Sequence, residues 1–447
     1  EEIMLEMIDL YQQHKASGHW DKQAFLRDAA RIPGMYVPSL YDVSYNEDGT
    51  VAAITPRDGA PAKITKRICK DMDKAFYPET FVVPYTEVVH DRAVLEVMRG
   101  CIRGCRFCQA GFIYRPIRAK SPDVLCSQGR SLCESTGYEE MSLSSLSTSD
   151  HPQVEEMLDK IIDYTLEEKI NLSLPSLRVD NFSKELLDKV NKVRKTGLTF
   201  APEAGSQRLR DVINKGVTEE EIMRTSRIAF EGGYTGVKLY FMLGLPTETE
   251  EDLLGITRLG QKIVDLYYSL PTKPKGKAVN VTISVSTFVP KPFTPFQWCA
   301  QDTFDQIVAK HDLLRHSLTT RKISLNYHEV KTSVLEGVLA RGDRRLGRVI
   351  YTAWKKGCKF DSWEEHFDFD KWKEAMDEAG LTMEFYASRE RSPEEILPWD
   401  HIDVGVTKAF LLREYEKAKR AEITPNCKEH CAGCGANQLI GGGRCIG

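Results

Sequence analysis

The sequence predicts an α/β protein built on a mainly parallel sheet, either a full or partial (β/α)6 barrel or an open sheet. Three observations support this fold class: 41% of the residues are hydrophobic, strand-length apolar runs recur along the chain, and helical patterns separate them. At 447 residues the chain is long enough for two to four domains of about 100 to 200 residues each. Its 28% charged residues argue against a membrane protein and against a collagen-like one.

Six strands and five helices are expected in the central part of the chain. The strands are Ala93 to Met98, Glu140 to Leu146, Asn171 to Leu177, Gly197 to Ala201, Thr235 to Leu243 and Val279 to Phe288. The helices are Pro122 to Ser135, Pro152 to Glu167, Ser183 to Lys195, Ser206 to Phe230 and Glu250 to Leu270. Such βαβ units place ligands at the carboxyl ends of the strands, so the residues that follow each strand are the candidates for a site.

Four regions follow from these patterns. Residues 1–92 form an N-terminal linker or cap, and residues 93–328 form the β/α core, with an extra strand expected at Lys322 to Tyr327. Residues 329–420 form a helical C-terminal domain, and residues 421–447 form a cysteine-rich tail.

The composition favours a cytoplasmic protein that does not associate with a membrane. The sequence contains no apolar run of about 18 residues, and its acidic start lacks the pattern of a signal peptide. Twelve cysteines in such a chain indicate metal binding or catalysis rather than disulfides. Since the first residue is Glu1, we expect a further segment upstream.

Charge is unevenly distributed after the core. Residues 311–360 hold eleven Lys or Arg against four Asp or Glu, whereas residues 361–400 hold four against thirteen. The two segments either pair with each other or leave a basic docking strip with interleaved aromatic residues. That strip would contain Arg341, Arg344, Arg345, Arg348, Lys355 and Lys356, with Tyr351 and Trp354.

The first cysteine group lies directly after the first expected strand. Cys101, Cys105 and Cys108 place three thiols on one short loop. Three thiolates bind a [4Fe-4S] cube and leave one iron without a protein ligand, which is the open position that metal chemistry requires. A structural zinc ion would need a fourth ligand close by, and the nearby Gln109 and Tyr114 are poor ligands.

The chain resembles the radical SAM superfamily, and more closely a subgroup often linked to a cobalamin-binding domain, with a methylthiotransferase-like core. The resemblance covers roughly residues 33–435 and includes the Cys-x3-Cys-x-aromatic-Cys loop. Its other motifs are Met98-Arg-Gly-Cys101, Gln109 to Pro116, Ser142 to Asp150, Phe200 to Gly205 and Lys238 to Glu248. The resemblance implies that S-adenosylmethionine (SAM) chelates the open iron and is cleaved reductively to a 5′-deoxyadenosyl radical.

Further residues acquire roles from this resemblance. Serine hydroxyls after the second strand would bind the methionyl ammonium, Arg178 or Lys238 its carboxylate, and Glu203 the ribose. Bare backbone after the fifth strand would approach the adenine. The expected SAM-binding residues are Ser144, Ser145, Ser147, Arg178, Glu203, Lys238, Gly244 and Pro246.

The tail repeats the spacing of the first group and is expected to form an auxiliary metal site. Its thiols are Cys427, Cys431, Cys434 and Cys445, with His430 as the alternative fourth ligand. A second [4Fe-4S] cluster is the expected occupant and an all-cysteine zinc ion the alternative, because ligand type alone does not distinguish them.

The sequence therefore predicts a radical SAM enzyme of the transferase type that modifies RNA or protein by methylthiolation or methylation. A small-molecule substrate is the alternative, and a zinc-stabilised nucleic-acid-binding scaffold is the alternative of another class. A one-electron reductant such as flavodoxin or ferredoxin is an expected partner. Cobalamin would enter only through an upstream domain, because the chain has no Asp-x-His-x-x-Gly loop to ligate cobalt.

Overall fold

Two parallel sheets form the centre of the protein. The structure, a computed structural model, describes residues 2–173, 198–273, 276–443 and 445. In the first sheet the order is β4 (Ala93–Glu96), β7 (Glu140–Ser144) and β8 (Asn171–Ser173). In the second sheet β9 (Leu198–Glu203), β10 (Gly236–Leu243), β11 (Asn280–Thr287) and β12 (Ile323–Tyr327) lie side by side in chain order. All of these neighbours pair in parallel, which confirms the predicted α/β class.

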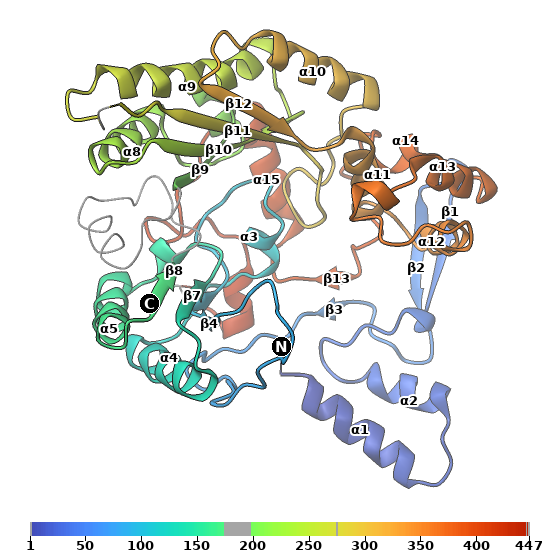
Figure 1. Ribbon diagram of the computed structural model, residues 1–447. Helices are drawn as coiled ribbons and strands as arrows, with labels where there is room; N and C mark the ends of the chain where they lie inside the picture. The colour runs from blue at the N-terminus through green and yellow to red at the C-terminus, as the bar shows by residue number, and fades with distance from the viewer. Residues whose placement is uncertain (1, 174–197, 274–275, 444, 446–447) are drawn as a thin grey trace.

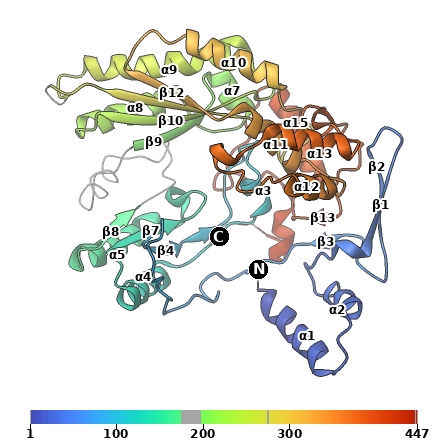
Figure 2. The ribbon, with the colours of Figure 1, turned by 45° about the vertical axis from the view of Figure 1, so that its right-hand side comes forward.

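Helices cover one side of each sheet (Figure 1). The first sheet packs on α4 (Pro122–Thr136) and α5 (Val154–Glu167), and the second packs on α8 (Glu219–Glu231), α9 (Glu250–Ser269) and α10 (Phe304–His316). Their uncovered faces are directed toward each other, with the short helix α3 (Ala110–Ile113) between the sheets in both Figure 1 and Figure 2. Seven parallel strands in chain order, with helices outside, form a partial barrel.

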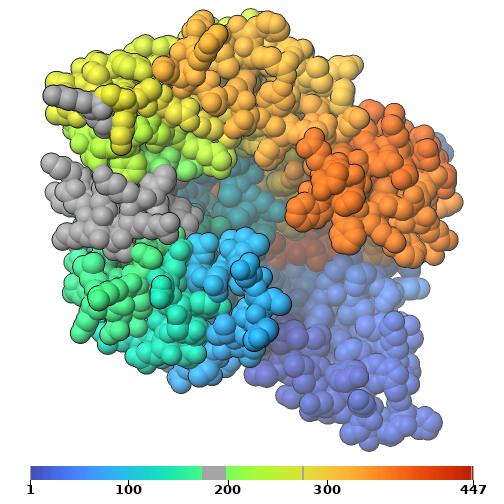
Figure 3. Space-filling model, in the orientation of Figure 1, coloured from blue at the N-terminus to red at the C-terminus, as the bar shows by residue number. Residues whose placement is uncertain are grey.

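Side chains along β10 alternate between the two faces of its sheet. Leu239 and Phe241 are buried against the outer helices, whereas Lys238 and Tyr240 point to the other face and stay partly exposed. The space between the uncovered faces is thus lined by polar side chains. Figure 3 shows the molecule hollowed there, to the right of the grey atoms.

Most strand and helix predictions are confirmed, with one correction to a helix. The extra strand expected at Lys322 to Tyr327 is β12, which raises the described parallel strands from six to seven. The helix expected over Ser206 to Phe230 is instead two helices, α7 (Gln207–Val212) and α8. Asn214 and Gly216 have positive φ angles of 52° and 63°, which a right-handed helix excludes. The helix expected at Ser183 to Lys195 and the last residues of the third strand lie outside the described residues.

Side-chain caps determine where the core helices begin. The Ser121 hydroxyl accepts a hydrogen bond from Val124 N at the start of α4. Thr218 and Glu221 form a capping box on α8, and Thr249 and Asp252 form one on α9. Each cap satisfies backbone N–H groups that the first turn of a helix leaves without partners.

Asp252 connects two helix starts. Its carboxylate accepts hydrogen bonds from Thr249 N at 2.8 Å, from the Ser206 hydroxyl before α7, and from the Arg208 guanidinium. Burial alone would raise the pKa of Asp252, but these hydrogen bonds outweigh burial and lower the pKa from 3.8 to about 2. The charged carboxylate therefore stabilises the junction of α7 and α9.

We expect Asp252→Asn to lower the free energy of unfolding by about 2 kcal/mol at pH 7. Because the folded-state pKa is the lower one, this contribution is complete above about pH 4 and is lost as the pH falls toward 2. Urea unfolding of both proteins across this range measures the difference. Asp265→Asn, at an exposed position of the same helix, is the control and should change stability by no more than about 0.5 kcal/mol. A difference between wild type and Asp252→Asn that is unchanged from pH 7 to pH 2 would contradict the assignment.

The N-terminal region lies at one side of the molecule. Its elements are α1 (Met4–Ala16), α2 (Lys22–Ala29), η1 (Pro38–Leu40), β1 (Tyr41–Tyr45), β2 (Val51–Pro56) and β3 (Ile64–Thr65). Figures 1 and 2 both show α1 and α2 away from the two sheets. β1 and β2 form an antiparallel hairpin, while β3 pairs in parallel with β13 (Ile402–Asp403) from the far end of the chain.

The C-terminal region is mainly helical, as expected. It contains α11 (Val330–Ala340), α12 (Leu346–Lys355), η3 (Glu364–His366), α13 (Phe369–Glu378), α14 (Met383–Tyr386), α15 (Lys408–Lys419) and η4 (Ala436–Ile440). No helix in the described part of the chain has the length and apolar character needed to cross a bilayer.

Much of the basic strip is engaged within the fold. Arg341 is fully buried and donates to the carbonyls of Ala387 and Arg389, while Arg344 donates to the Tyr41 and Pro38 carbonyls. Arg345 pairs with Asp343, and Lys356 pairs at 2.8 Å with Glu374 and Glu378 of α13. The last pairing joins the basic segment to the acidic one, as expected if the two segments pair with each other. Arg348, Tyr351, Trp354 and Lys355 remain exposed on α12.

Candidate active site and cysteine tail

The cysteine loop, residues Cys101–Cys108, begins at a tight backbone crossing. After β4 the chain enters β5 (Met98–Arg99), which pairs antiparallel with β6 (Arg118–Ala119). Gly100 lies between this pair and Cys101 with a φ angle of 86°, and a Cβ there would lie 2.7 Å from the Tyr114 carbonyl oxygen. Only glycine fits this position, so the closed base of the loop requires the Arg-Gly-Cys motif.

The three thiols of the loop lie together and are partly buried. Burial raises the pKa of the Cys101 thiol to about 12, and the nearby Cys105 and Cys108 add to the rise. Burial and Cys105 likewise raise the pKa of Cys108. The Cys108 N–H donates to the Cys105 carbonyl at 3.0 Å, which closes the turn between them. All twelve cysteines lie among the described residues, and none forms a disulfide. The donor set fits a cationic centre that would hold these thiols as thiolates.

A buried ion pair ties the loop to the end of β7. Arg103 donates to both carboxylate oxygens of Asp150, at 2.8 and 2.5 Å, and the Ser147 hydroxyl donates to the same carboxylate at 2.7 Å. Ser147 is therefore a support for Asp150, whereas Ser145 bonds with Thr148 at 2.9 Å. The sequence motif contained Asp150 but gave it no role, because its partner lies 47 positions away.

The end of β9 approaches the loop from the other sheet. Glu203 has a φ angle of 68° and accepts a hydrogen bond from Lys215 Nζ at 3.1 Å. Both side chains lie near enough to Cys108 to affect the pKa of its thiol, which Lys215 lowers and Glu203 raises. Lys215, which the sequence motifs did not single out, thus accompanies the predicted Glu203.

Arg115 braces the loop from its C-terminal side. This buried guanidinium donates to the carbonyls of Gly111 at 2.9 Å and Arg103 at 2.7 Å, and it stacks over the Phe112 ring at 4.8 Å. Lys66 from the N-terminal region in turn donates to the Arg115 carbonyl at 2.5 Å. The loop is therefore held in shape before any cofactor binds.

The remaining expected SAM-binding residues are spread more widely. Ser144 is exposed at the end of β7, and Lys238 lies on the uncovered face of β10 with its ammonium 4.8 Å from the Tyr240 ring centre. Arg178 lies outside the described residues. Gly244 and Pro246 line a pocket of about 370 Å³ together with Tyr415, and no residue of the cysteine loop lines it.

The backbone N–H of Gly244 is hydrogen-bonded within its own turn. The Gly244 N–H donates to the Glu248 carboxylate at 2.9 Å, and Glu248 pairs with Lys310 at 2.7 Å. Lys310 also contacts Asp302 at 2.6 Å. Burial raises the pKa of Glu248, although Lys310 opposes the rise. The structure therefore shows a turn built around a buried carboxylate at this strand end.

The cysteine tail, residues Cys427–Cys445, brings its four thiols close to one another. Burial raises the pKa of the Cys445 thiol to about 11, and Cys434, Cys427 and Cys431 add to the rise. The alternative ligand, His430, is exposed on the surface. In the described part of the chain, no group of three or more His, Cys, Asp or Glu side chains is arranged to hold a metal ion.

These features define a class: a β/α enzyme core with a braced three-cysteine loop at the carboxyl end of its first parallel strand. Residues 95–260 match the model of the Radical SAM superfamily. Residues 95–260 therefore form a radical SAM domain, and the superfamily of this domain has a [4Fe-4S] cluster and SAM as cofactors. The match supports an enzyme rather than the non-catalytic scaffold.

The similarity to known proteins extends beyond the radical SAM domain. The "Uncharacterized protein MJ0966" of Methanocaldococcus jannaschii is 30% identical over 295 residues, which are 64% of this chain and 62% of that protein. The "Putative methylthiotransferase MJ0865" of the same organism is 26% identical over 171 residues, 36% of this chain and 37% of that protein. The chain thus spans less than two thirds of the length of either relative.

Two solved structures align with part of the chain. One is the radical SAM methyltransferase TsrM from Kitasatospora setae with cobalamin and a [4Fe-4S] cluster bound, with a TM-score of 0.36 and 15% identity, covering 46% of this chain and 38% of that one. The other is Elp3 from Methanocaldococcus infernus, with a TM-score of 0.31 and 12% identity, covering 54% and 57%.

Proposed function

We propose that the protein binds a [4Fe-4S] cluster through Cys101, Cys105 and Cys108 and uses it to cleave SAM reductively. The bound cluster would supply an electron to the sulfonium and so yield a 5′-deoxyadenosyl radical that takes a hydrogen atom from substrate. The observation that carries this proposal is the braced loop itself: three clustered thiols at the carboxyl end of β4, within the matched domain.

The surrounding residues are suited to support this chemistry. The Arg103–Asp150 ion pair would keep the loop at a fixed distance from the end of β7. Glu203 and Lys215 place one negative and one positive group beside Cys108. Lys238, on the uncovered face of β10, is a candidate for the methionyl carboxylate. The loop keeps its shape through contacts with its own chain, which is the preorganisation that a reactive site requires.

The test is direct. The protein, reconstituted anaerobically with iron and sulfide, is incubated with SAM and dithionite, and 5′-deoxyadenosine and methionine are quantified by mass spectrometry. The proposal expects 5′-deoxyadenosine to form only with both SAM and reductant present. A fully loaded cluster that yields none would refute it.

We further propose that the substrate is an RNA or a protein that receives a methyl or methylthio group. The support is the similarity to a protein named a putative methylthiotransferase, together with the exposed Arg348, Tyr351, Trp354 and Lys355 on α12. Comparing the masses of cellular RNA nucleosides and ribosomal proteins with and without the gene tests this part. A change confined to small metabolites would favour the alternative, a small-molecule substrate.

A further inference from the structure

The cysteine tail is docked directly on the cysteine loop. The Cys427 N–H donates to the carbonyl of Ile102 at 3.1 Å, so the first cysteine of the tail contacts the residue that follows the first cysteine of the loop. Asn214 adds a bridge, because its side-chain amide donates at 3.1 Å to both the Gly104 and the Thr424 carbonyls. The Thr424 N–H returns a hydrogen bond to Asn214 at 2.9 Å.

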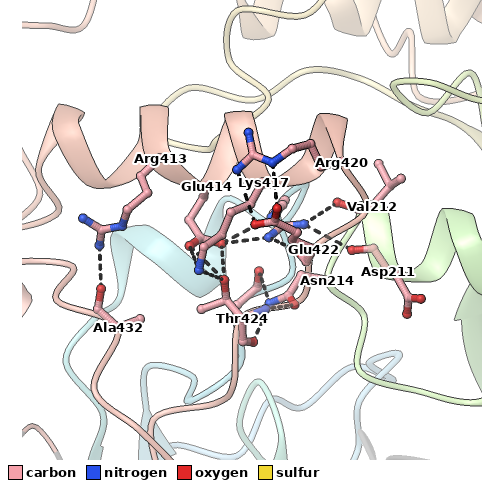
Figure 4. A network of polar contacts seen from close by, with 12 residues as sticks. Asp211, Val212, Asn214, Arg413, Glu414, Lys417, Arg420, Glu422, Thr424 and Ala432 are labelled. Atoms are coloured by element: carbon pink, nitrogen blue, oxygen red, sulfur yellow. Dashed lines mark hydrogen bonds and ion pairs between the residues drawn. The ribbon is translucent and has the colours of Figure 1, made fainter.

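A buried ion pair secures the same contact. Arg106, fully buried between two cysteines of the loop, pairs with Glu414 of α15 at 3.1 Å and donates to the Glu422 carbonyl at 2.7 Å. Glu414 also accepts a hydrogen bond from Thr424 at 2.9 Å, and Figure 4 shows how Glu414, Thr424 and Asn214 converge. Since a buried charge without its partner is costly, this network holds α15 and the tail to the loop.

Local backbone geometry then gathers the tail thiols. The Cys434 carbonyl accepts a hydrogen bond from Thr407 N at 3.0 Å, just before α15. Gly435 follows with a φ angle of 97°, and a Cβ there would lie 2.8 Å from the Thr407 side chain. The turn through η4 is closed by Asn437, whose side chain donates to the Gly443 carbonyl at 3.1 Å. This turn leads the chain back toward the other three cysteines before Cys445.

We propose that Cys427, Cys431, Cys434 and Cys445 bind a second [4Fe-4S] cluster, directly beside the cysteine loop of the radical SAM domain. The choice of an iron–sulfur cube over zinc rests on the spacing: the first three tail cysteines repeat the spacing of Cys101, Cys105 and Cys108, the group assigned to a [4Fe-4S] cluster above. Cys445 supplies a fourth thiolate, as a cube with four protein ligands requires.

Metal analysis of three variants tests this proposal. After anaerobic reconstitution the wild-type chain should hold about eight iron and eight sulfide ions, and the double variant Cys431→Ala/Cys445→Ala, which keeps only two tail thiols, should hold about four of each. Cys431 is exposed and Cys445 is only partly buried, so their loss should leave the fold intact. A variant with Cys101, Cys105 and Cys108 all replaced by alanine should keep the tail cluster, again with about four irons. Cys126→Ala, on α4, is the control and should keep about eight.

A separate measurement tests whether the two clusters lie close together. In the dithionite-reduced wild type, electron paramagnetic resonance should show magnetic interaction between two clusters, and this interaction should vanish in each single-cluster variant. One zinc per chain in the tail, or equal iron in wild type and Cys431→Ala/Cys445→Ala, would overturn the proposal. Two clusters without magnetic interaction would overturn the placement beside the loop. The outcome is independent of the proposed function, because the tail cluster is counted by iron whether or not 5′-deoxyadenosine forms.

Discussion

Cys105→Ala is expected to abolish formation of 5′-deoxyadenosine from SAM, with a loss of at least about 100-fold relative to wild type. That figure is a lower bound, because replacing even the outer partners of metal ligands costs about 10- to 100-fold in affinity or activity. The loop offers three thiols to the cluster, one each from Cys101, Cys105 and Cys108. Within the described loop, residues 101–108, no fourth cysteine could replace Cys105.

The matched control is Cys126→Ala. This thiol lies on α4, where its sulfur contacts the Lys160 carbonyl at 4.0 Å on the outer side of the sheet. We expect wild-type amounts of 5′-deoxyadenosine from this variant, measured under the same anaerobic conditions. If Cys105→Ala produced as much 5′-deoxyadenosine as Cys126→Ala, the assignment of the loop would be wrong.

Gly205→Ala should have the largest effect on stability, lowering the free energy of unfolding by about 3 kcal/mol or more. Gly205 is buried where the backbone before α7 crosses α9 at Gly255. An added Cβ would lie 2.6 Å from the Gly255 carbonyl carbon and closer still to Asp252 O and Ile256 N. These are backbone atoms of a packed helix, so no side-chain rotation relieves the overlap.

Urea unfolding of purified protein measures this effect, and Gly347→Ala provides the control. Gly347 lies on the exposed side of α12, and a Cβ there meets no atom within 4 Å. Alanine favours a helix over glycine, so this control should gain about 0.5 to 1 kcal/mol. Equal stability of Gly205→Ala and wild type would show that the two backbones do not touch as described.

Much of the β/α core follows from local patterns. The run Thr235 to Leu243 contains β10 and Glu250 to Leu270 contains α9, because strand and helix periodicities and a threonine cap are encoded within a few neighbouring residues. The division of the helix expected over Ser206 to Phe230 was missed. Asn214 has a left-handed backbone there, and nothing in hydrophobic periodicity reports that conformation.

The candidate site was only partly predictable. Cysteine spacing identified the loop, since three ligands of one cluster lie within one short segment. Asp150 and Lys215 were not assigned roles, because each acts through a partner on another element. In the basic strip the sequence analysis assigned a possible surface role to an arginine that the fold buries. Arg341 lies buried against backbone carbonyls, and counting charges cannot distinguish it from an exposed arginine.

The sequence by itself determined the order of strands and helices and the two cysteine groups, because these depend on residues that are neighbours in the chain. Only the tertiary structure decided that the groups lie against each other. Arg106 and Glu414 are 308 positions apart, and their pairing depends on how α15 packs against the loop and α7. Such packing results from burial of surfaces that distant segments share, and no local pattern records it.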